Sequence, residues 1–357
     1  MKVKIGTLTK IRTGKLDANA SSEDGQYPFF TCSREALRIS SYSYDCECVL
    51  VAGNGDLNVK YYNGKFDAYQ RTYIIEDNSD GKLYMPYLYY FMEGYIDELR
   101  KQAIGGVIKY IKLGNLTNAL IELPSMDKQK DVVNILEMLT GIIDLRNDMI
   151  LKLDELVKSR FVELFGECRK RVFLNDLCSI ITDGTHQPPK FQSDGVPFIF
   201  VSNLARDIIT YDTEKYISAE TYLELYKRTP IEIGDVLLST VGSYGHPAVV
   251  TEAKKFLFQR HIAYLKPKHD IVNSFFLHSA LLSPDGQRQI KEKVKGIAQK
   301  TLNLSEIRKI EIPLPELQKQ NQFADFAHQV DKSKLIVQKE LDETQLLFDS
   351  LMQEYFG

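Results

Sequence analysis

The sequence predicts an α+β protein of two similar tandem domains, joined by two long helices that form an antiparallel coiled coil with pseudo-two-fold symmetry. Three observations support this prediction. The phrase IELPSMDKQK, which contains Pro124, returns as IEIPLPELQKQ around Pro313, 189 positions later. Short apolar words match in the same order in both halves. A long heptad stripe of apolar residues follows each proline phrase.

Size and composition indicate a folded protein of the cytoplasm. The 357 residues allow two to three domains, each with its own core. No apolar run reaches the ~18 residues needed to span a bilayer, so no membrane partner is expected. The five scattered cysteines argue against a disulfide framework and suit a reducing compartment. The net charge is −3, but residues 167–315 carry more Lys and Arg than Asp and Glu, which permits a basic face there.

The first block of each half, residues 1–124 and 167–313, contains strand-like words separated by Gly, Pro and Asn turns. YPFFTCS matches VPFIFVS at an offset of 169, and CVLVAGNG matches DVLLSTVG at an offset of 187. YQRTYII matches FQRHIAY at 189, and the two halves end in matching words at 191. Because the offset grows in steps, loop insertions in the second half explain it.

The second block of each half, residues 125–166 and 314–357, predicts a helix that begins after the prolines. The first stripe runs from Val132 to Leu164 and includes Arg160, and Ile135, Ile142, Met149 and Leu156 widen it. The apolar residues expected to form the spacer coiled coil are Leu136, Leu139, Ile143, Ile150, Leu153, Val337, Leu341, Phe348 and Leu351. Such a helix is a rod of ~50 Å. Antiparallel packing would hold the two domains at a fixed distance, whereas a rival arrangement packs each helix on its own domain.

Motifs of catalysis are missing from the sequence. It contains no GxxxxGK[ST] phosphate loop, and QPPK at 187–190 lacks the Asn and the aromatic residue of an adenine-methylating NPP[YF] motif. Cys32, Cys46 and Cys48 lack a His or Cys pair at zinc-finger spacing, so ordinary thiols are favoured over a metal site. The six histidines form no HExxH pair. We therefore expect no catalytic residues and no bound metal.

Polar residues near predicted turns are the candidate contacts to DNA. In the second half they are Thr185, His186, Gln187, Lys190, Ser243, Tyr244, Gln259, Arg260, Gln299 and Lys300, and in the first half Asn54, Lys60, Gln70, Arg71 and Lys109. Lys and Arg bind phosphates without regard to sequence, while Asn, Gln, Arg and Ser can read base edges. Gln70-Arg71 matches Gln259-Arg260, and the segment RKQAIGGVIKYIK, which contains Lys109, is the counterpart of GQRQIKEKVKGIAQK, which contains Lys300. The alternative is that these residues belong to solvated loops and a charged helix face.

Several words resemble the specificity subunits of type I restriction-modification systems. They are DGTHQPPK, GVPFIFVSN, GDVLLS, GIAQKTLNLSEIRKIEIPLPELQKQNQF and LDETQLLFDSLMQEYFG in the second half, and CVLVAGNGD and GGVIKYIKLGNLTNALIELPSMDKQKDVVNIL in the first. The resemblance covers essentially the whole chain. It implies target recognition domains at 1–124 and 167–313, and spacer helices at 125–166 and 314–357.

The resemblance also implies the partners. A subunit of this family binds double-stranded DNA at two half-sites, has no catalysis of its own and recruits two modification subunits, which methylate adenine N6. The complex can add ATP-driven restriction subunits. S-adenosylmethionine, ATP and Mg would therefore belong to the partner subunits, and this chain would carry no cofactor.

Two departures and three alternatives accompany the resemblance. The first half has RTGKLDANASSEDGQYPFF where DGTH is expected, so Thr185 and His186 have no counterpart and the two domains should read different sequences. The phrase LQKQNQ has Lys319 where the family has a glutamate before the glutamine. The alternatives are a self-contained methyltransferase or nuclease, a helical scaffold that does not touch nucleic acid, and a specificity subunit for a fused restriction-methyltransferase.

Overall fold

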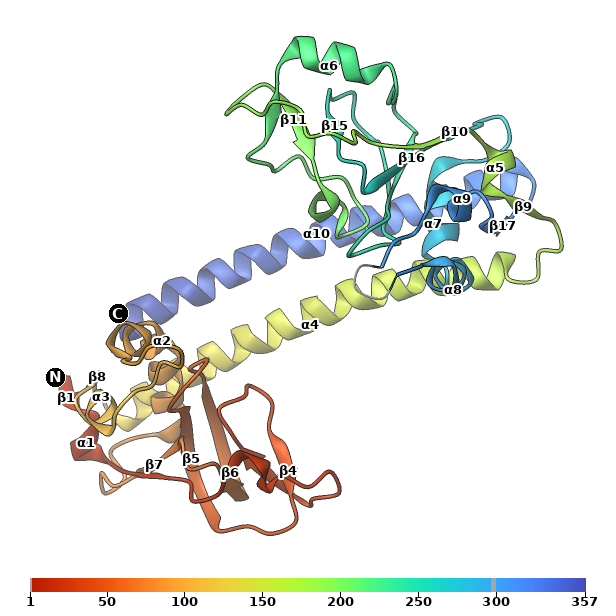
Figure 1. The fold of residues 1–357 in the computed structure, drawn as a ribbon. Coiled ribbons are helices and arrows are strands. Elements are labelled where there is room, and N and C mark those ends of the chain that lie inside the picture. The colour runs from red at the N-terminus through yellow and green to blue at the C-terminus, as the bar shows by residue number, and fades with distance from the viewer. Residues whose placement is uncertain (1, 297–299) are drawn as a thin grey trace. The chain divides into compact units, whose positions relative to one another are not determined.

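The computed structural model describes residues 2–296 and 300–357 (Figure 1). Its contacts divide the chain into two units. Unit 1 comprises Met1–Asn147 and Lys339–Gly357, and unit 2 comprises Asp148–Gln338. The boundaries fall inside the two long helices, so each helix contributes one part to each unit. The linear division at 124, 166 and 313 follows the elements and stays a prediction.

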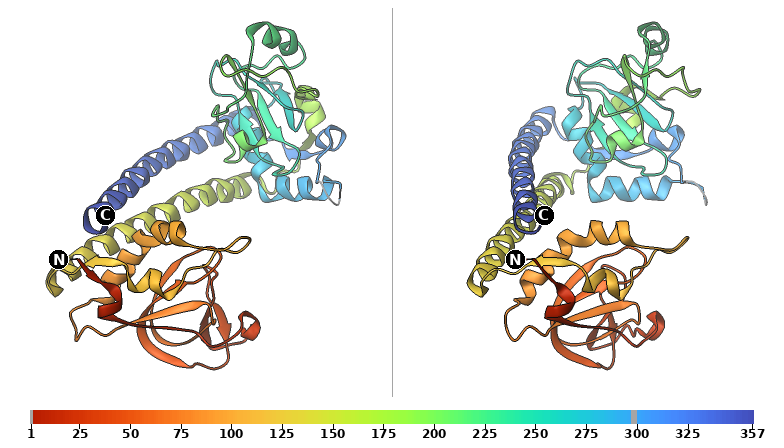
Figure 2. Two further views of the ribbon diagram at one scale, coloured as in Figure 1. Left: turned by 60° about the vertical axis from the view of Figure 1, so that its left-hand side comes forward. Right: turned by 90° about the vertical axis from the view of Figure 1, so that its left-hand side faces the viewer.

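Unit 1 contains a six-stranded sheet. Its strand order is β2 (Thr9–Thr13), β7 (Thr72–Asp77), β5 (Tyr44–Ala52), β6 (Val59–Ala68), β3 (Tyr27–Phe30) and β4 (Leu37–Ile39). Neighbouring strands are antiparallel except for the parallel pair β3 and β6. The helix α2 (Met85–Gln102) lies between this sheet and the long helix α4 (Met126–Phe165) (Figure 2). The remaining elements are β1 (Lys2–Lys4), which pairs with β8 (Leu120–Glu122), α1 (Ile5–Leu8), η1 (Ala18–Ala20) and α3 (Leu113–Thr117).

Unit 2 divides its strands among three sheets. The first sheet has the strand order β10 (Cys178–Asp183), β16 (Ile262–Pro267), β13 (Val236–Ser239) and β14 (Pro247–Val249). The second has the order β12 (Tyr216–Ile217), β11 (Val196–Ile199) and β15 (Leu257–Phe258). The third pairs β17 (Glu311–Pro313) with β9 (Arg171–Phe173). The helices are α5 (Leu174–Leu177), η2 (Val201–Leu204), α6 (Ala219–Tyr226), α7 (Ser274–Leu282), α8 (Pro284–Lys293) and α9 (Leu304–Ile307).

The strand pairs repeat between the units, which confirms the duplication. Val49 lies opposite Ile75 in unit 1, and Val236 lies opposite Leu265 in unit 2. The parallel pair β3 and β6 recurs as β11 and β15. The strands β3 and β11 reproduce the predicted offset of 169, and β5 and β13 reproduce the predicted offset of 187. The strands β7 and β16 have an offset of 190 rather than the predicted 189.

The two long helices, α4 (Met126–Phe165) and α10 (Leu317–Phe356), contain 40 residues each. They pack antiparallel, since Arg146 of α4 donates to the Glu340 carbonyl at 2.6 Å while Asp154, further along α4, pairs with the earlier Lys334 of α10. Every residue predicted to form the spacer coiled coil, from Leu136 to Leu351, is buried or half-buried.

The predicted stripe is wrong at the end of α4 and at its margin. Leu164 is 46% exposed and Arg160 is exposed, while Phe161 and Phe165 are buried in their place. An α-helix has 3.6 residues per turn, so its buried face drifts away from a strict heptad. The four residues predicted to widen the stripe, Ile135, Ile142, Met149 and Leu156, are exposed, because the face turned to α10 and the domain is narrower than predicted.

Each domain packs on both helices, which combines the two arrangements considered from the sequence. In unit 1, Val132 and Leu136 of α4 share a core with Phe348 and Phe356 of α10. In unit 2, Phe323 of α10 packs with Phe161 and Phe165 of α4 and with Phe276 of α7. The start of one helix and the end of the other therefore complete each core.

A buried glutamine explains why the proline phrase occurs twice. The Gln129 amide accepts from the Tyr84 N–H at 2.8 Å and donates to the carbonyls of Lys82 and Pro124 at 2.8 and 3.0 Å. The Gln320 amide accepts from the Asn273 N–H at 2.9 Å and donates to the carbonyls of Ile271 and Pro315 at 3.1 and 2.9 Å. Both side chains are fully buried. The glutamine thus joins the proline phrase to the domain in each half, whereas Lys319 is exposed.

Candidate nucleic-acid interface

Four loops of unit 2 meet at one end of its four-stranded sheet. Loop 184–190 leaves β10, loop 240–246 joins β13 to β14, and turn 259–261 precedes β16. The fourth segment follows α8, where Lys295 forms a bridge with Thr301 and Thr301 forms a second bridge with Val241 of loop 240–246. The Arg260 N–H donates to the Thr185 carbonyl at 3.0 Å, and the Thr240 N–H donates to the His261 carbonyl at 2.9 Å. The Leu302 N–H donates to the Thr240 carbonyl at 2.8 Å. Backbone hydrogen bonds therefore tie the loops into one surface.

Unit 1 builds the same surface from the equivalent loops. The Gln70 N–H donates to the Leu16 carbonyl at 2.8 Å, and the Gly53 N–H donates to the Arg71 carbonyl at 2.7 Å. The Ile111 N–H donates to the Gly53 carbonyl at 2.9 Å, which places hairpin 104–110 beside loop 53–58. Lys109 immediately precedes Tyr110 of the Ile104–Tyr110 bridge, and Lys300 immediately precedes Thr301 of the equivalent Lys295–Thr301 bridge.

The first half does have a backbone counterpart of the DGT word. A Cβ on Gly14 would lie 2.1 Å from the Ala68 carbonyl oxygen, and a Cβ on Gly184 would lie 2.3 Å from that of Phe258. Because glycine has no Cβ, it is the residue that lets the backbone of each unit leave its strand this close to the neighbouring strand. Thr185 accordingly corresponds to Leu16, which corrects the expectation that it has no counterpart.

The predicted match between Gln70-Arg71 and Gln259-Arg260 is displaced by one residue. The bridge from Leu16 runs to Tyr69, whereas the bridge from Thr185 runs to Gln259. Arg260 therefore corresponds to Gln70. The sequence match aligned identical letters, but the backbone hydrogen bonds set the register. Equivalent positions of the two surfaces thus carry different side chains.

The structure brings most of the predicted contact residues to these surfaces. In unit 2, Thr185, Tyr244 and Gln259 are half-buried, and the exposed residues are His186, Gln187, Lys190, Ser243, Arg260 and Lys300. Gln299 lies outside the described residues. In unit 1, Asn54 is half-buried, and the exposed residues are Gln70, Arg71 and Lys109. Lys60 lies on β6 instead of in a loop, it donates to the Asn58 amide oxygen, and burial lowers its pKa.

Two carboxylates that the sequence analysis missed hold cations at these surfaces. In unit 2, Asp183 contacts His186 and pairs with Arg228. In unit 1, Asp56 pairs with Arg34 at 3.2 Å and with Arg100 at 3.3 Å. The hydrogen bond from Arg34, with the positive charges of Arg34 and Arg100, lowers the pKa of Asp56. The arginine partners lie 22 to 45 positions away from these carboxylates in sequence, so no local pattern could reveal the arginine pairs.

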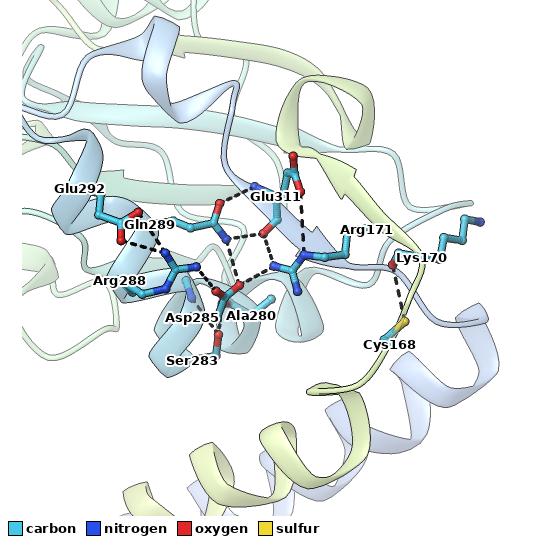
Figure 3. Close-up of polar contacts among 11 residues, drawn as sticks. Cys168, Lys170, Arg171, Ala280, Ser283, Asp285, Arg288, Gln289, Glu292 and Glu311 are labelled. Carbon is cyan, nitrogen blue, oxygen red and sulfur yellow. Dashed lines mark hydrogen bonds and ion pairs between the residues drawn. The ribbon is translucent and has the colours of Figure 1, made fainter.

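A polar cluster fixes α8, which ends shortly before Lys295 of the Lys295–Thr301 bridge (Figure 3). Asp285 pairs with Arg171 of β9 and, at 2.6 Å, with Arg288. Gln289 exchanges two hydrogen bonds with the backbone of Glu311 on β17, at 2.7 and 2.9 Å. Burial alone would raise the pKa of Asp285, but the two guanidinium groups lower it. The cluster thus anchors the helix that precedes the Lys295–Thr301 bridge.

The described residues contain no group of three or more His, Cys, Asp or Glu side chains able to hold a metal ion. Burial raises the pKa values of the Cys46 and Cys48 thiols, which keeps both protonated at neutral pH. In the described part of the chain, no helix is long and apolar enough to cross a membrane.

Comparisons with known proteins agree on one family. The family model of the type I restriction modification DNA specificity domain matches residues 1–155 and again 169–345. The EcoDI specificity subunit of a type I restriction enzyme from Escherichia coli is 38% identical over 156 residues, which cover 44% of this chain and 34% of that protein. This chain therefore aligns with about a third of that relative's length.

Two further relatives extend the likeness over most of the chain. The EcoBI specificity subunit of a type I restriction enzyme, also from Escherichia coli, is 23% identical over 340 residues, or 86% of this chain and 71% of that protein. The crystal structure of a type I restriction-modification system S subunit from M. genitalium superposes with a TM-score of 0.62 at 16% identity. It covers 100% of this chain and 96% of that one, and this likeness shows the fold.

Proposed function

The chain belongs to the type I restriction-modification DNA specificity family, and from this premise we propose that it reads a bipartite DNA sequence for a type I restriction-modification complex. One observation carries the proposal: each unit gathers four loops with polar and cationic side chains at one end of its sheet. Cations such as Lys109 and Lys300 would bind phosphates, and the amides and hydroxyls would read base edges.

The two units would read different half-sites. Leu16 stands where unit 2 has Thr185, and Gln70 stands where unit 2 has Arg260. An apolar side chain contacts the thymine methyl group, whereas a hydroxyl or guanidinium group hydrogen-bonds to base edges. Different side chains on a repeated backbone therefore support a two-part, asymmetric site.

Methylation and restriction would be the work of separate subunits, which would bring S-adenosylmethionine, ATP and Mg. The sequence supports this division because it lacks an adenine-methylating motif and a phosphate loop. A subunit that reads chromosomal DNA for such a complex would act in the cytoplasm. Purified chain that bound S-adenosylmethionine by itself would contradict the division of labour.

An exposed apolar row on α4 supports a partner-binding role for the spacer. In unit 1, Ile135, Met138, Ile142 and Leu145 repeat at heptad spacing, and Met138 and Leu145 are each 65% exposed. Such a stripe is the seam by which one helix packs on another. We assign it to a helix of a modification subunit. Met138→Glu with Leu145→Glu should abolish co-purification with that subunit, while Glu137→Gln, the control, should not.

The main test is the sequencing of methylated adenines in cells that express this chain with its modification subunits. The expected result is a motif of two defined half-sites separated by a fixed unspecified gap, present only when this chain is present. Binding of purified chain to the motif should weaken steeply with salt. An unchanged set of methylated adenines, together with salt-independent binding or none, would contradict the proposal.

A further inference from the structure

A pocket of about 380 Å³ opens in unit 2 beside loop 184–190. The loop provides His186, Gln187 and Lys190, and the end of α6 and the residues after it provide Glu224 and Arg228. Pro188 and Pro189 fix two backbone φ angles of the loop, and Gly184 fixes where it leaves β10. The pocket is therefore a stiff feature of the surface that we assign to DNA.

Asp183 orients two side chains of this pocket, His186 and Arg228. It is the last residue of β10, paired in the sheet with Ala263, and its side chain is only 17% exposed. One carboxylate oxygen lies 2.8 Å from His186 Nε2, and the other accepts from Arg228 Nη2 at 2.5 Å. The Arg228 side chain is 51% exposed. Because a guanidinium group has five N–H donors, one bond to Asp183 leaves donors for a ligand.

The lining suits a base edge better than a phosphate. Lys190 and Arg228 offer donors, but the Glu224 carboxylate shares the pocket and would repel an anion. Base edges present donors and acceptors together, and the commonest specific contact is an arginine bound through two N–H groups to guanine O6 and N7. A guanidinium held by a carboxylate loses little conformational entropy when it makes this contact.

We propose that Arg228 reads a guanine in the half-site bound by unit 2, and that Asp183 positions it. The inference rests on the proposed function and names one of its base contacts. Unit 1 has Thr13 at the strand position of Asp183, since Thr13 lies opposite Tyr73 as Asp183 lies opposite Ala263. The contact therefore belongs to one half-site alone.

The test compares four variants with the wild type, each expressed with its modification subunits. Arg228→Lys keeps the positive charge but loses the paired N–H donors of the guanidinium group, and Arg228→Ala loses both. Asp183→Asn removes the carboxylate that pairs with Arg228 and orients it. The control, Lys227→Ala, removes an adjacent exposed cation. Adenine methylation is mapped first. Competition binding then uses duplexes in which each G·C pair of the motif is replaced in turn.

The expected result is that Arg228→Lys and Arg228→Ala relax one G·C position in one half-site and leave the other half-site unchanged. Discrimination at that pair should fall about tenfold or more, because a bidentate contact is lost. Affinity of Arg228→Lys for unrelated DNA should stay within about twofold. Asp183→Asn should relax the same position less, which a general loss of structure would not do.

Three results would overturn the inference: an unchanged motif in both Arg228 variants, a relaxed A·T position, or an equal loss of affinity for all sequences. The last would make Arg228 a phosphate contact. Failure of the proposed function is seen earlier, because the wild type would then show no bipartite motif at all.

Discussion

Units 1 and 2 share their strand pairs and their buried glutamine but differ in the segments that reach the sheet end. Unit 1 has only the short strand β4 between β3 and β5, whereas unit 2 has η2, β12 and α6 between β11 and β13. This insertion in unit 2 accounts for the increase, from 169 to 187, in the sequence offset between matching residues of the two halves. The helix α2 is continuous, while its counterpart is divided into α7 and α8 at Pro284, which cannot continue a helix.

The difference separates the scaffold from the reading surface. Elements that hold the helices, such as β1 with β8 and β9 with β17, keep their pairing in both units. The segment that changes length carries Arg228 and one wall of the pocket, and loop 184–190 forms the other wall. Recognition can therefore change in one unit while the contacts to the spacer helices stay the same.

The strongest test of the shared scaffold is in the two cores. Phe323 and Val132 occupy equivalent helix positions, and both are buried. Phe323→Ala should lower the free energy of unfolding by about 3–5 kcal/mol, because three phenylalanines surround the ring. Val132→Ala should cost about 2 kcal/mol. Denaturant unfolding followed by circular dichroism measures both, and the exposed Val162→Ala is the control. Equal losses at the two positions would show that the aromatic cluster adds nothing.

The buried glutamines should be equally important in the two units. Gln129→Ala and Gln320→Ala each leave one N–H and two carbonyls without their side-chain partner, which should cost roughly 2–3 kcal/mol of unfolding free energy. The adjacent exposed Lys128→Ala and Lys319→Ala should change little. The same denaturation measurement applies. A large loss in one unit with almost none in the other would contradict the equivalence of the two proline phrases.

The sequence predicted the scaffold because its signals are periodic or repeated. Heptad spacing located α4 and α10, and repeated words identified the tandem domains. The prediction was wrong where the three-dimensional geometry decides which of two adjacent residues occupies a position. Phe161 is buried in place of Arg160, because a heptad count does not include the drift of a 3.6-residue helical turn. Gln70 rather than Arg71 corresponds to Arg260, because backbone hydrogen bonds set the register. The pairing of Asp183 with Arg228 could not be predicted, because it joins residues 45 positions apart through a fold.

Charge reversal at Lys109 and at Lys300 tests whether both sheet ends bind DNA. Lys300→Glu and Lys109→Glu should each weaken binding to unrelated duplex DNA and lower the slope of log affinity against log salt by about one. Arg260→Glu should weaken binding too, whereas Gln70→Ala should have a smaller effect, since only unit 2 has a cation at this position. Fluorescence anisotropy at several salt concentrations measures the slopes. Full affinity in both lysine variants would show that Lys109 and Lys300 do not belong to the DNA interface.

The smallest expected effect concerns the anchor of α8, in which Asp285 pairs with Arg171 and Arg288. The arginines lower the pKa of Asp285 in the folded state, so its contribution to stability is present above pH ~4 and is lost as the pH falls through the lowered value. Asp285→Asn should therefore destabilise the chain near pH 7 by less than about 1 kcal/mol, because the side chain is 41% exposed.

The pH dependence distinguishes this anchor from an ordinary surface pair. Wild type and Asp285→Asn should approach each other in stability as the pH falls below about 4, because the wild-type carboxylate then becomes neutral. Asp97→Asn on α2 is the matched control, since Asp97 pairs with Arg100 on an exposed helix face and should change stability by less than about 0.5 kcal/mol. A difference between wild type and Asp285→Asn that stayed constant from pH 7 to pH 3 would mean that Asp285 acts through packing. In that case α8 would be held by the hydrogen bonds between Gln289 and Glu311 without the ion pairs.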